Sequence, residues 1–125
     1  MTTSRLFLAI LGFSWLGYGL YCLISPGQLA TVAGVAGQTL AGNNELRAMY
    51  GGVQSVIGLS ALYGAFKPAW SRWSLQIQVL ICAGLAPTRI VSALATGDGS
   101  AYTIGACGFE LGCLILAVLL LRRNA

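Results

Sequence analysis

The chain has 125 residues, of which 57% are hydrophobic and only 8% are charged, and its formal net charge is +4. Soluble domains carry about 25% charged residues, and disordered chains and coiled coils carry still more, so this composition excludes all three classes. The seven Lys and Arg residues are scattered along the chain and form no basic stripe typical of a nucleic-acid interface. A single membrane domain remains, and since about 20 residues cross a bilayer once, the length allows four or five crossings at most.

The first apolar run extends from Leu6 to Ile24 and closes at Ser25, Pro26 and Gly27. Its length is sufficient to span a bilayer. A cleaved signal peptide is the alternative, because Arg5 followed by an apolar core also fits that pattern, but such cores have about 7 to 15 residues. We therefore expect a retained helix over about residues 5–24.

The segment 25–44 is too polar and too rich in small residues to cross a membrane. Ser25, Pro26 and Gln28 fit an N-cap, a first-turn proline and a capping-box partner. Four apolar residues then recur at helical spacing: Leu29, Val32, Ala36 and Leu40. This pattern predicts a short helix along or within the membrane interface, and a loose Gly/Ala loop is the alternative.

Three more apolar runs predict helices over about residues 45–66, 71–96 and 101–121. Asn43 and Asn44 can cap the first of these, and Lys67 with Pro68 can end it. Ser100 can cap the last helix after the turn at 97–99. The predicted fold is an all-α integral membrane bundle of four helices in one domain, residues 1–125.

The positions of the basic residues predict the orientation of this bundle. Arg5 precedes the first helix, and Lys67 and Arg72 flank the turn between the second and third helices. Arg122 and Arg123 follow the last helix, whereas the turn at Asp98 has no basic residue. Because Lys and Arg accumulate on the cytoplasmic side, both termini are predicted to be cytoplasmic. Trp70 and Trp73 fall at that boundary, where aromatic rings anchor a helix at the head-group level.

Three charged residues within the predicted spans are candidates for function: Arg47, Arg89 and Glu110. Charges inside a bilayer are costly unless they are paired or hydrated. At 1.5 Å per residue, Arg89 lies about 10 Å and Glu110 about 13 Å inside the outer ends of consecutive antiparallel helices. These two side chains can therefore meet at one depth.

Polar residues on the first two helices approach the same level. Arg47, Tyr50 and Gln54 recur at i, i+3 and i+7, which places them on one helical face, with Glu45 one turn above. The residues predicted to form a polar pocket in the outer half of the bundle are Tyr18, Glu45, Arg47, Tyr50, Gln54, Arg89 and Glu110. Donors outnumber acids among them, so the pocket suits an anionic or carbonyl-bearing amphiphile such as a lipid, a fatty acid or a quinone.

A structural interpretation has equal weight. Arg89 and Glu110 can be a pair that locks the last two helices together, with Glu45 and Arg47 solvated near the surface. Pro87 favours the pocket slightly, because a broken helical hydrogen bond at membrane depth is tolerated where a cavity or neighbouring groups satisfy the free carbonyl. Gly108 and Gly112 match the GxxxG packing motif, which predicts close packing within the chain or, alternatively, dimerisation.

Nothing in the sequence requires an enzyme, a cofactor or a metal. The chain has no His, and its four Cys residues form no C-x-x-C pair, so a haem or zinc site built by this chain alone is not expected. The cysteines are expected to be small buried residues, although Cys22 and Cys107 could meet near the outer side. Transport would require oligomerisation, because four short helices leave little room for alternating access.

The segment Glu45-Leu-Arg47-Ala-Met-Tyr50-Gly-Gly52 resembles the E-x-R-x-x-Y-G-G signature of a family of small bacterial four-helix membrane proteins of unknown function. That family is similar to the DoxX-like group, and Arg89 and Glu110 fit its general pattern. The resemblance implies a four-helix bundle in the bacterial inner membrane without established activity, and in the wider group a link to quinone-coupled oxidoreductases as a membrane subunit. So small a bundle exposes much of its surface to lipid or to partners, so besides binding an amphiphile the chain could be an accessory subunit of a larger membrane complex. The alternative is a subunit of a quinone-coupled oxidoreductase or isomerase, in which Glu110 would exchange protons.

Overall fold

The computed structural model describes residues 2–123, and within this range it contains helices and no strands. The first helix, α1 (Thr3–Ile24), is capped by Thr2, whose side chain accepts from the amide of Arg5. After Ser25 the chain forms a short helix, α2 (Gln28–Ala33), that ends at Gly34 in the left-handed conformation with φ of 68°. The short helix predicted for this segment is therefore present, but it ends before Ala36 and Leu40.

The second long helical segment is a continuous rod of three pieces. These are α3 (Leu40–Leu46), the π-helix η1 (Arg47–Val53) and α4 (Gln54–Phe66), and the residues at both junctions keep right-handed helical dihedrals. The rod begins five residues earlier than the predicted start at residue 45, because Thr39 caps it by accepting from the amide of Gly42 at 3.0 Å. Asn43 and Asn44, which were predicted to be the caps, lie inside α3.

The chain then passes through the short 3₁₀ helix η2 (Pro68–Trp70) into α5 (Ser71–Thr96), and Gly97 ends α5 with φ of 72°. The last helix is α6 (Ala101–Arg123). As predicted, Ser100 caps it, since its hydroxyl oxygen accepts from the amide of Thr103 at 3.3 Å. In the described part of the chain, three helical stretches are long and apolar enough to cross a membrane: Thr3–Ile24, Pro68–Thr96 and Ala101–Arg123.

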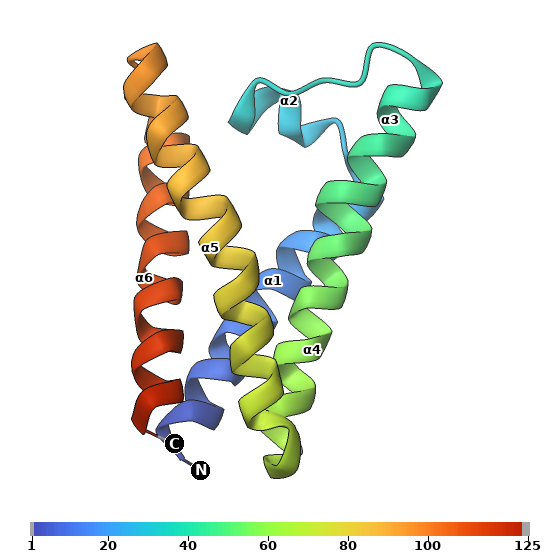
Figure 1. Cartoon of the computed structure of the whole chain (residues 1–125). Coiled ribbons are helices and arrows are strands. Elements are labelled where there is room, and N and C mark those ends of the chain that lie inside the picture. Colours follow the sequence, from blue (N-terminus) through green and yellow to red (C-terminus); the bar gives the residue numbers. More distant parts are fainter. Residues whose placement is uncertain (1, 124–125) are drawn as a thin grey trace.

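The helices form two pairs, α1 with the rod α3–η1–α4 and α5 with α6 (Figure 1). The pairs lie together at the end of the molecule that holds both termini, and they diverge toward the other end, where α2 lies (Figure 1). We call these the closed end and the open end.

Glycines allow the close approach of α1 to the rod. A Cβ atom at Gly58 would lie 2.8 Å from the carbonyl oxygen of Gly12, and one at Gly19 would lie 2.6 Å from the amide of Ser55. A Cβ at Gly108 or Gly112, in contrast, would meet no atom within 4 Å. Close packing within the chain at the GxxxG motif was therefore a wrong prediction, and the small residues that bring helices together lie on α1 and α4 instead.

Three polar side chains of α5 join it to α4. The hydroxyls of Ser71 and Ser74 donate to the carbonyl oxygens of Gly64 and Ser60 at 2.6 and 2.7 Å, and Gln78 Nε2 donates to Ile57 O at 3.4 Å. Gln78 is fully buried. Ser71, Ser74 and Gln78 thus face protein, where side-chain donors find the acceptors that a bilayer does not supply.

The hydrophobic core differs between the two ends. The cluster at the closed end, around Leu8, Ala65 and Leu120, and the central cluster, around Trp15 and Cys82, each include residues from α1, α4, α5 and α6. The third cluster, at the open end, consists of Cys22, Leu29 and Leu46, which come from α1, α2 and α3. Because α5 and α6 contribute nothing to this third cluster, the two helix pairs are not packed together there.

Candidate functional site

A cavity of about 470 Å³ lies between the two helix pairs, on the open side of the central core cluster. We call it the inter-pair cavity. It is lined by Ser14, Trp15, Tyr18, Tyr50, Gln54, Arg89, Ala101, Tyr102, Gly105, Ala106, Phe109 and Glu110. Its volume falls within the range of roughly 300–1,000 Å³ that is usual for sites of small molecules, and its wall is mainly apolar with a few polar groups.

Five of the seven residues predicted for the polar pocket line this cavity: Tyr18, Tyr50, Gln54, Arg89 and Glu110. They come from α1, η1, α4, α5 and α6. Glu45 and Arg47 do not line the cavity, and both are exposed. The helical spacing predicted that Arg47 shares a face with Tyr50 and Gln54, but residues 47–53 form a π-helix, whose i→i+5 hydrogen bonds place more residues in each turn. The 3.6-residue repeat therefore fails over this stretch.

The two membrane-depth charges form an ion pair, as their predicted depths indicated. Arg89 Nη2 lies 2.7 Å from Glu110 Oε1, and Arg89 Nε donates to both carboxylate oxygens at 3.2 and 3.0 Å. The Glu110 side chain is 5% exposed and the Arg89 side chain 29%. The pair leaves the wall of the cavity without net charge, because no other Lys, Arg, Asp or Glu residue lines it.

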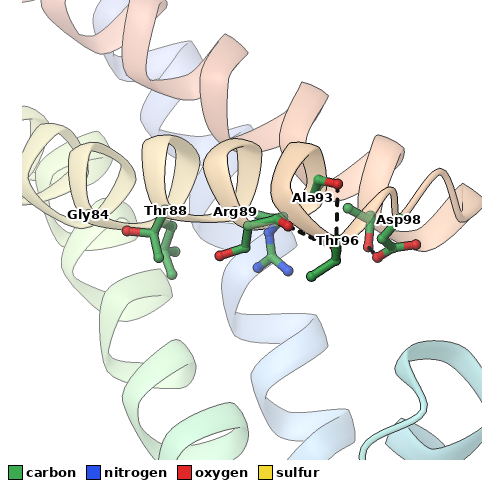
Figure 2. A pocket seen from close by; sticks show the side chains of 9 residues that line it. Gly84, Thr88, Arg89, Ala93, Thr96 and Asp98 are labelled. Carbon is green, nitrogen blue, oxygen red and sulfur yellow. Dashed lines mark hydrogen bonds between the residues drawn. The ribbon is translucent and has the colours of Figure 1, made fainter.

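Arg89 also lines a second hollow of about 370 Å³ between α5 and α6, which we call the α5 groove. Figure 2 shows Thr88, Arg89, Thr96 and Asp98 with their side chains on one side of α5. The groove leads from Asp98, in the exposed turn before α6, to the guanidinium of Arg89. A charged group at membrane depth is tolerated where it is paired or lines a polar path, and Arg89 meets both conditions.

The carboxylate of Asp98 organises the turn at the mouth of the α5 groove. Its Oδ2 accepts from the Thr103 hydroxyl at 2.6 Å, and its Oδ1 accepts from the amide of Ser100 at 2.9 Å. These hydrogen bonds, first that from Thr103 and then that from Ser100, hold the pKa of Asp98 below its ordinary value. The charged form of Asp98 therefore stabilises the start of α6.

Three buried polar atoms on the wall of the inter-pair cavity have no hydrogen-bond partner. They are Trp15 Nε1, the Tyr18 hydroxyl, which lies next to Tyr102, and Gln54 Oε1. Trp15 is only 6% exposed, and its indole ring meets Phe109 edge to face at 5.6 Å between centroids. A buried polar group without a partner costs about 1–3 kcal/mol. The cavity thus presents an unpaired donor, an unpaired acceptor and a hydroxyl that can serve as either.

Sequence reasoning found Tyr18 and Tyr50 but missed three other aromatic residues of the wall, Trp15, Tyr102 and Phe109. Tyr102, Ala106, Phe109 and Glu110 stand at i, i+4, i+7 and i+8 on α6, so the helical repeat starting from Glu110 identifies this face. Trp15 lies three residues before Tyr18 on α1, so the helical repeat starting from Tyr18 identifies it too. Pro87, which we took as a sign of a cavity, lies within α5, is exposed and does not line the inter-pair cavity.

The four cysteines are free thiols, and Cys22, Cys82 and Cys113 are buried as predicted, whereas Cys107 is partly buried. Cys82 and Cys113 belong to the same core cluster beneath the cavity. In the described residues, no group of three or more His, Cys, Asp or Glu side chains could hold a metal ion.

The fold and the site together define a small helical membrane protein with a mainly apolar pocket between its two helix pairs. The chain belongs to a family that is described as a domain of unknown function, DUF4345, whose family model matches residues 3–121. No curated protein and no solved structure matches the chain.

Proposed function

We propose that this chain is a membrane protein that binds one amphiphile in the inter-pair cavity. The observation that carries the proposal is that three of the five unpartnered buried side-chain atoms in the described residues line this one cavity. A ligand that accepts from Trp15 and donates to Gln54 would remove the cost of leaving these atoms unpaired. The tail of the ligand would lie along the apolar wall between the helix pairs.

The head group of this amphiphile is uncharged in our proposal. Both oxygens of Glu110 already accept from Arg89, and Arg47, which would have added a second positive charge, is exposed outside the cavity. An anionic head group such as that of a fatty acid would have to compete with Glu110 for Arg89. A hydroxyl or carbonyl group, as in a neutral lipid or a quinone, would bond the unpaired atoms without disturbing the ion pair.

For the membrane topology we propose four crossings in the bacterial inner membrane. The rod Leu40–Phe66 packs along α1, and at 1.5 Å per residue its length of about 40 Å exceeds the roughly 30 Å of a hydrocarbon core. An even number of crossings accords with the position of both termini at the closed end (Figure 1). Five basic residues lie at that end, so we assign it to the cytoplasm.

Two other roles have less support. An accessory subunit of a membrane complex would need no ligand, and the unpaired atoms in the cavity would then have no explanation. A proton-exchanging Glu110 in a quinone-coupled oxidoreductase or isomerase would need a free carboxyl, whereas both of its oxygens are engaged by Arg89.

Native mass spectrometry of the full chain, extracted gently from its own membrane, tests the proposal. We compare wild type with Tyr18→Phe/Gln54→Leu, which removes two unpaired groups at nearly constant volume. Because an unpaired buried polar group is replaced by an apolar one, this variant should fold at least as stably as the wild type. Ser55→Ala is the matched control, since the Ser55 hydroxyl is also buried and unpartnered but does not line the cavity.

A defined extra mass on the wild type and on Ser55→Ala, absent from the double variant, is the expected result. The same mass on all three proteins would show that the unpaired groups do not hold the ligand. A wild type that carries stoichiometric protein companions and no small molecule would support the accessory-subunit role instead.

A further inference from the structure

The closed end of the molecule concentrates positive charge. Five of the seven basic residues lie there, namely Arg5, Lys67, Arg72, Arg122 and Arg123. The chain has three Asp and Glu residues, and none lies at this end: Glu45 and Asp98 belong to the open end, and Glu110 lies about 16 Å along α6 from Leu121. No acidic side chain therefore neutralises this group of cations.

Two of these arginines line a pocket of about 310 Å³, which we call the basic pocket. It lies among the start of α1, the start of α5 and the end of α6, and its wall includes Arg5, Ser71, Arg72 and Leu121. Arg5 donates from Nε to Ala65 O at 2.6 Å, so its two terminal nitrogens are not used by this bond. Arg72 is exposed, and no acidic side chain pairs with it in the described residues.

An apolar groove begins where the basic pocket ends. It has a volume of about 480 Å³ and is lined by Trp73, Gln76, Ile77, Val79, Leu80 and Leu121. Leu121 belongs to both walls, so the pocket and the groove adjoin. Trp73 and Leu80 are 63% and 73% exposed, and α5 continues along the groove into the predicted hydrocarbon region.

We propose that this composite surface is a binding site for one anionic phospholipid. The phosphate lies between Arg5 and Arg72, where guanidinium groups can bind its oxygens with paired hydrogen bonds. One acyl chain follows the apolar groove past Leu121 along Ile77 and Leu80. The order of cations and apolar side chains along α5 matches the order of head group and acyl chain in a phospholipid, and the excess of positive charge selects an anionic one.

This site is independent of the inter-pair cavity. The two share no lining residue, and the cavity extends from the centre toward the open end, whereas the basic pocket lies at the closed end. Loss of the amphiphile from the cavity and loss of the phospholipid from the closed end are therefore separate results.

The test is a lipid titration of the full chain in detergent, followed by native mass spectrometry, with phosphatidylglycerol and phosphatidylcholine of identical acyl chains as probes. We expect one tightly bound phosphatidylglycerol and at least tenfold weaker binding of phosphatidylcholine. Each arginine near an anionic lipid contributes about a fivefold change in affinity. Arg72→Gln should thus weaken phosphatidylglycerol binding about fivefold, and Arg5→Gln/Arg72→Gln about 25-fold.

Arg122→Gln/Arg123→Gln is the matched control, because it removes the same charge from the same end without altering the wall of the basic pocket. It should change phosphatidylglycerol affinity less than twofold. Equal losses in the two double variants would show a diffuse charge effect and overturn the proposal, as would equal binding of the two lipids. If Arg5→Gln fails to fold because α1 loses its bond to Ala65, the single variant Arg72→Gln decides the question against Arg122→Gln.

Discussion

The structure of the Arg89–Glu110 ion pair predicts that its variants lose stability, and it also predicts which variant loses more. We consider three variants: Arg89→Leu, Glu110→Gln and the double change. Breaking a buried ion pair by removing one partner costs about 3–5 kcal/mol, because the remaining charge stays buried without compensation. Replacing both partners with uncharged groups is often nearly neutral.

The two single variants should differ, because the partners are not equally buried. Arg89→Leu leaves a carboxylate that is 5% exposed, so we expect the full cost of about 3–5 kcal/mol. Glu110→Gln leaves a guanidinium that is 29% exposed and borders the polar α5 groove. The amide of Gln still accepts one hydrogen bond from it, so we expect a cost of about 1–3 kcal/mol. The double variant should cost less than Arg89→Leu alone.

Equilibrium unfolding in mixed micelles gives the free energy of unfolding for all four proteins, and the double-mutant cycle gives the coupling energy directly. We expect a coupling of at least about 2 kcal/mol, which is the excess of the summed single losses over the loss in the double variant. Two outcomes would refute the reasoning. Additive losses would mean that the pair does not couple, and a larger loss for Glu110→Gln than for Arg89→Leu would mean that burial does not set the cost.

Three further predictions concern packing, capping and pH. Gly58→Ala should destabilise the chain by about 1–3 kcal/mol, because its Cβ would lie 2.8 Å from Gly12 O. Gly112→Ala places its Cβ in open space and should be neutral or slightly stabilising in the same unfolding assay. Equal effects of the two substitutions would contradict the packing of α1 against α4. Thr39→Ala should lower the free energy of unfolding by about 0.5–2 kcal/mol, because it removes the cap of the rod. Thr39→Ser keeps a hydroxyl at this position and should have the stability of the wild type. An unchanged stability of Thr39→Ala would show that the cap is not needed. Because the pKa of Asp98 is lowered on folding, its carboxylate stabilises the protein above its ordinary pKa of about 3.9, and this contribution disappears as pH falls through the folded-state pKa. Asp98→Asn should therefore destabilise at pH 7 and match the wild type at the lowest pH at which both unfold reversibly, and a constant difference across that range would rule this out.

Much of the fold could be predicted because membrane helices leave a strong local signal. Length and hydropathy alone identified α1, α5 and α6, and the turn residues located their ends to within about two residues. The meeting of Arg89 and Glu110 also followed from rise per residue and antiparallel order. Those inferences depend on regular α-helical geometry and on contacts between helices that are consecutive in the chain.

The failures occur where the backbone departs from that geometry. The π-helix at residues 47–53 has no sequence signal that outweighs the helical repeat, so the predicted face carried Arg47 into a pocket from which the structure excludes it. The start of the rod was misplaced because Thr39 and Asn43 are both competent caps, and local propensity does not rank them. The packing role of glycines was assigned to Gly108 and Gly112 by motif, whereas the close approaches lie between α1 and α4, where Gly58 meets Gly12 and Gly19 meets Ser55.

The arrangement of the core explains how a small bundle can keep a cavity open. Hydrogen bonds from Ser71, Ser74 and Gln78 to α4 and the two four-helix clusters fix the pairs at the closed end and at the centre. The Arg89–Glu110 ion pair joins α5 to α6 within one helix pair and does not cross the cavity, whereas Tyr18 of α1 lies beside Tyr102 of α6 across it. Separation of the pairs at that end therefore breaks none of these bonds, and a molecule that enters the inter-pair cavity has only to bond the unpaired atoms of Trp15, Tyr18 and Gln54. Binding would then stabilise the open end without rearranging the closed one.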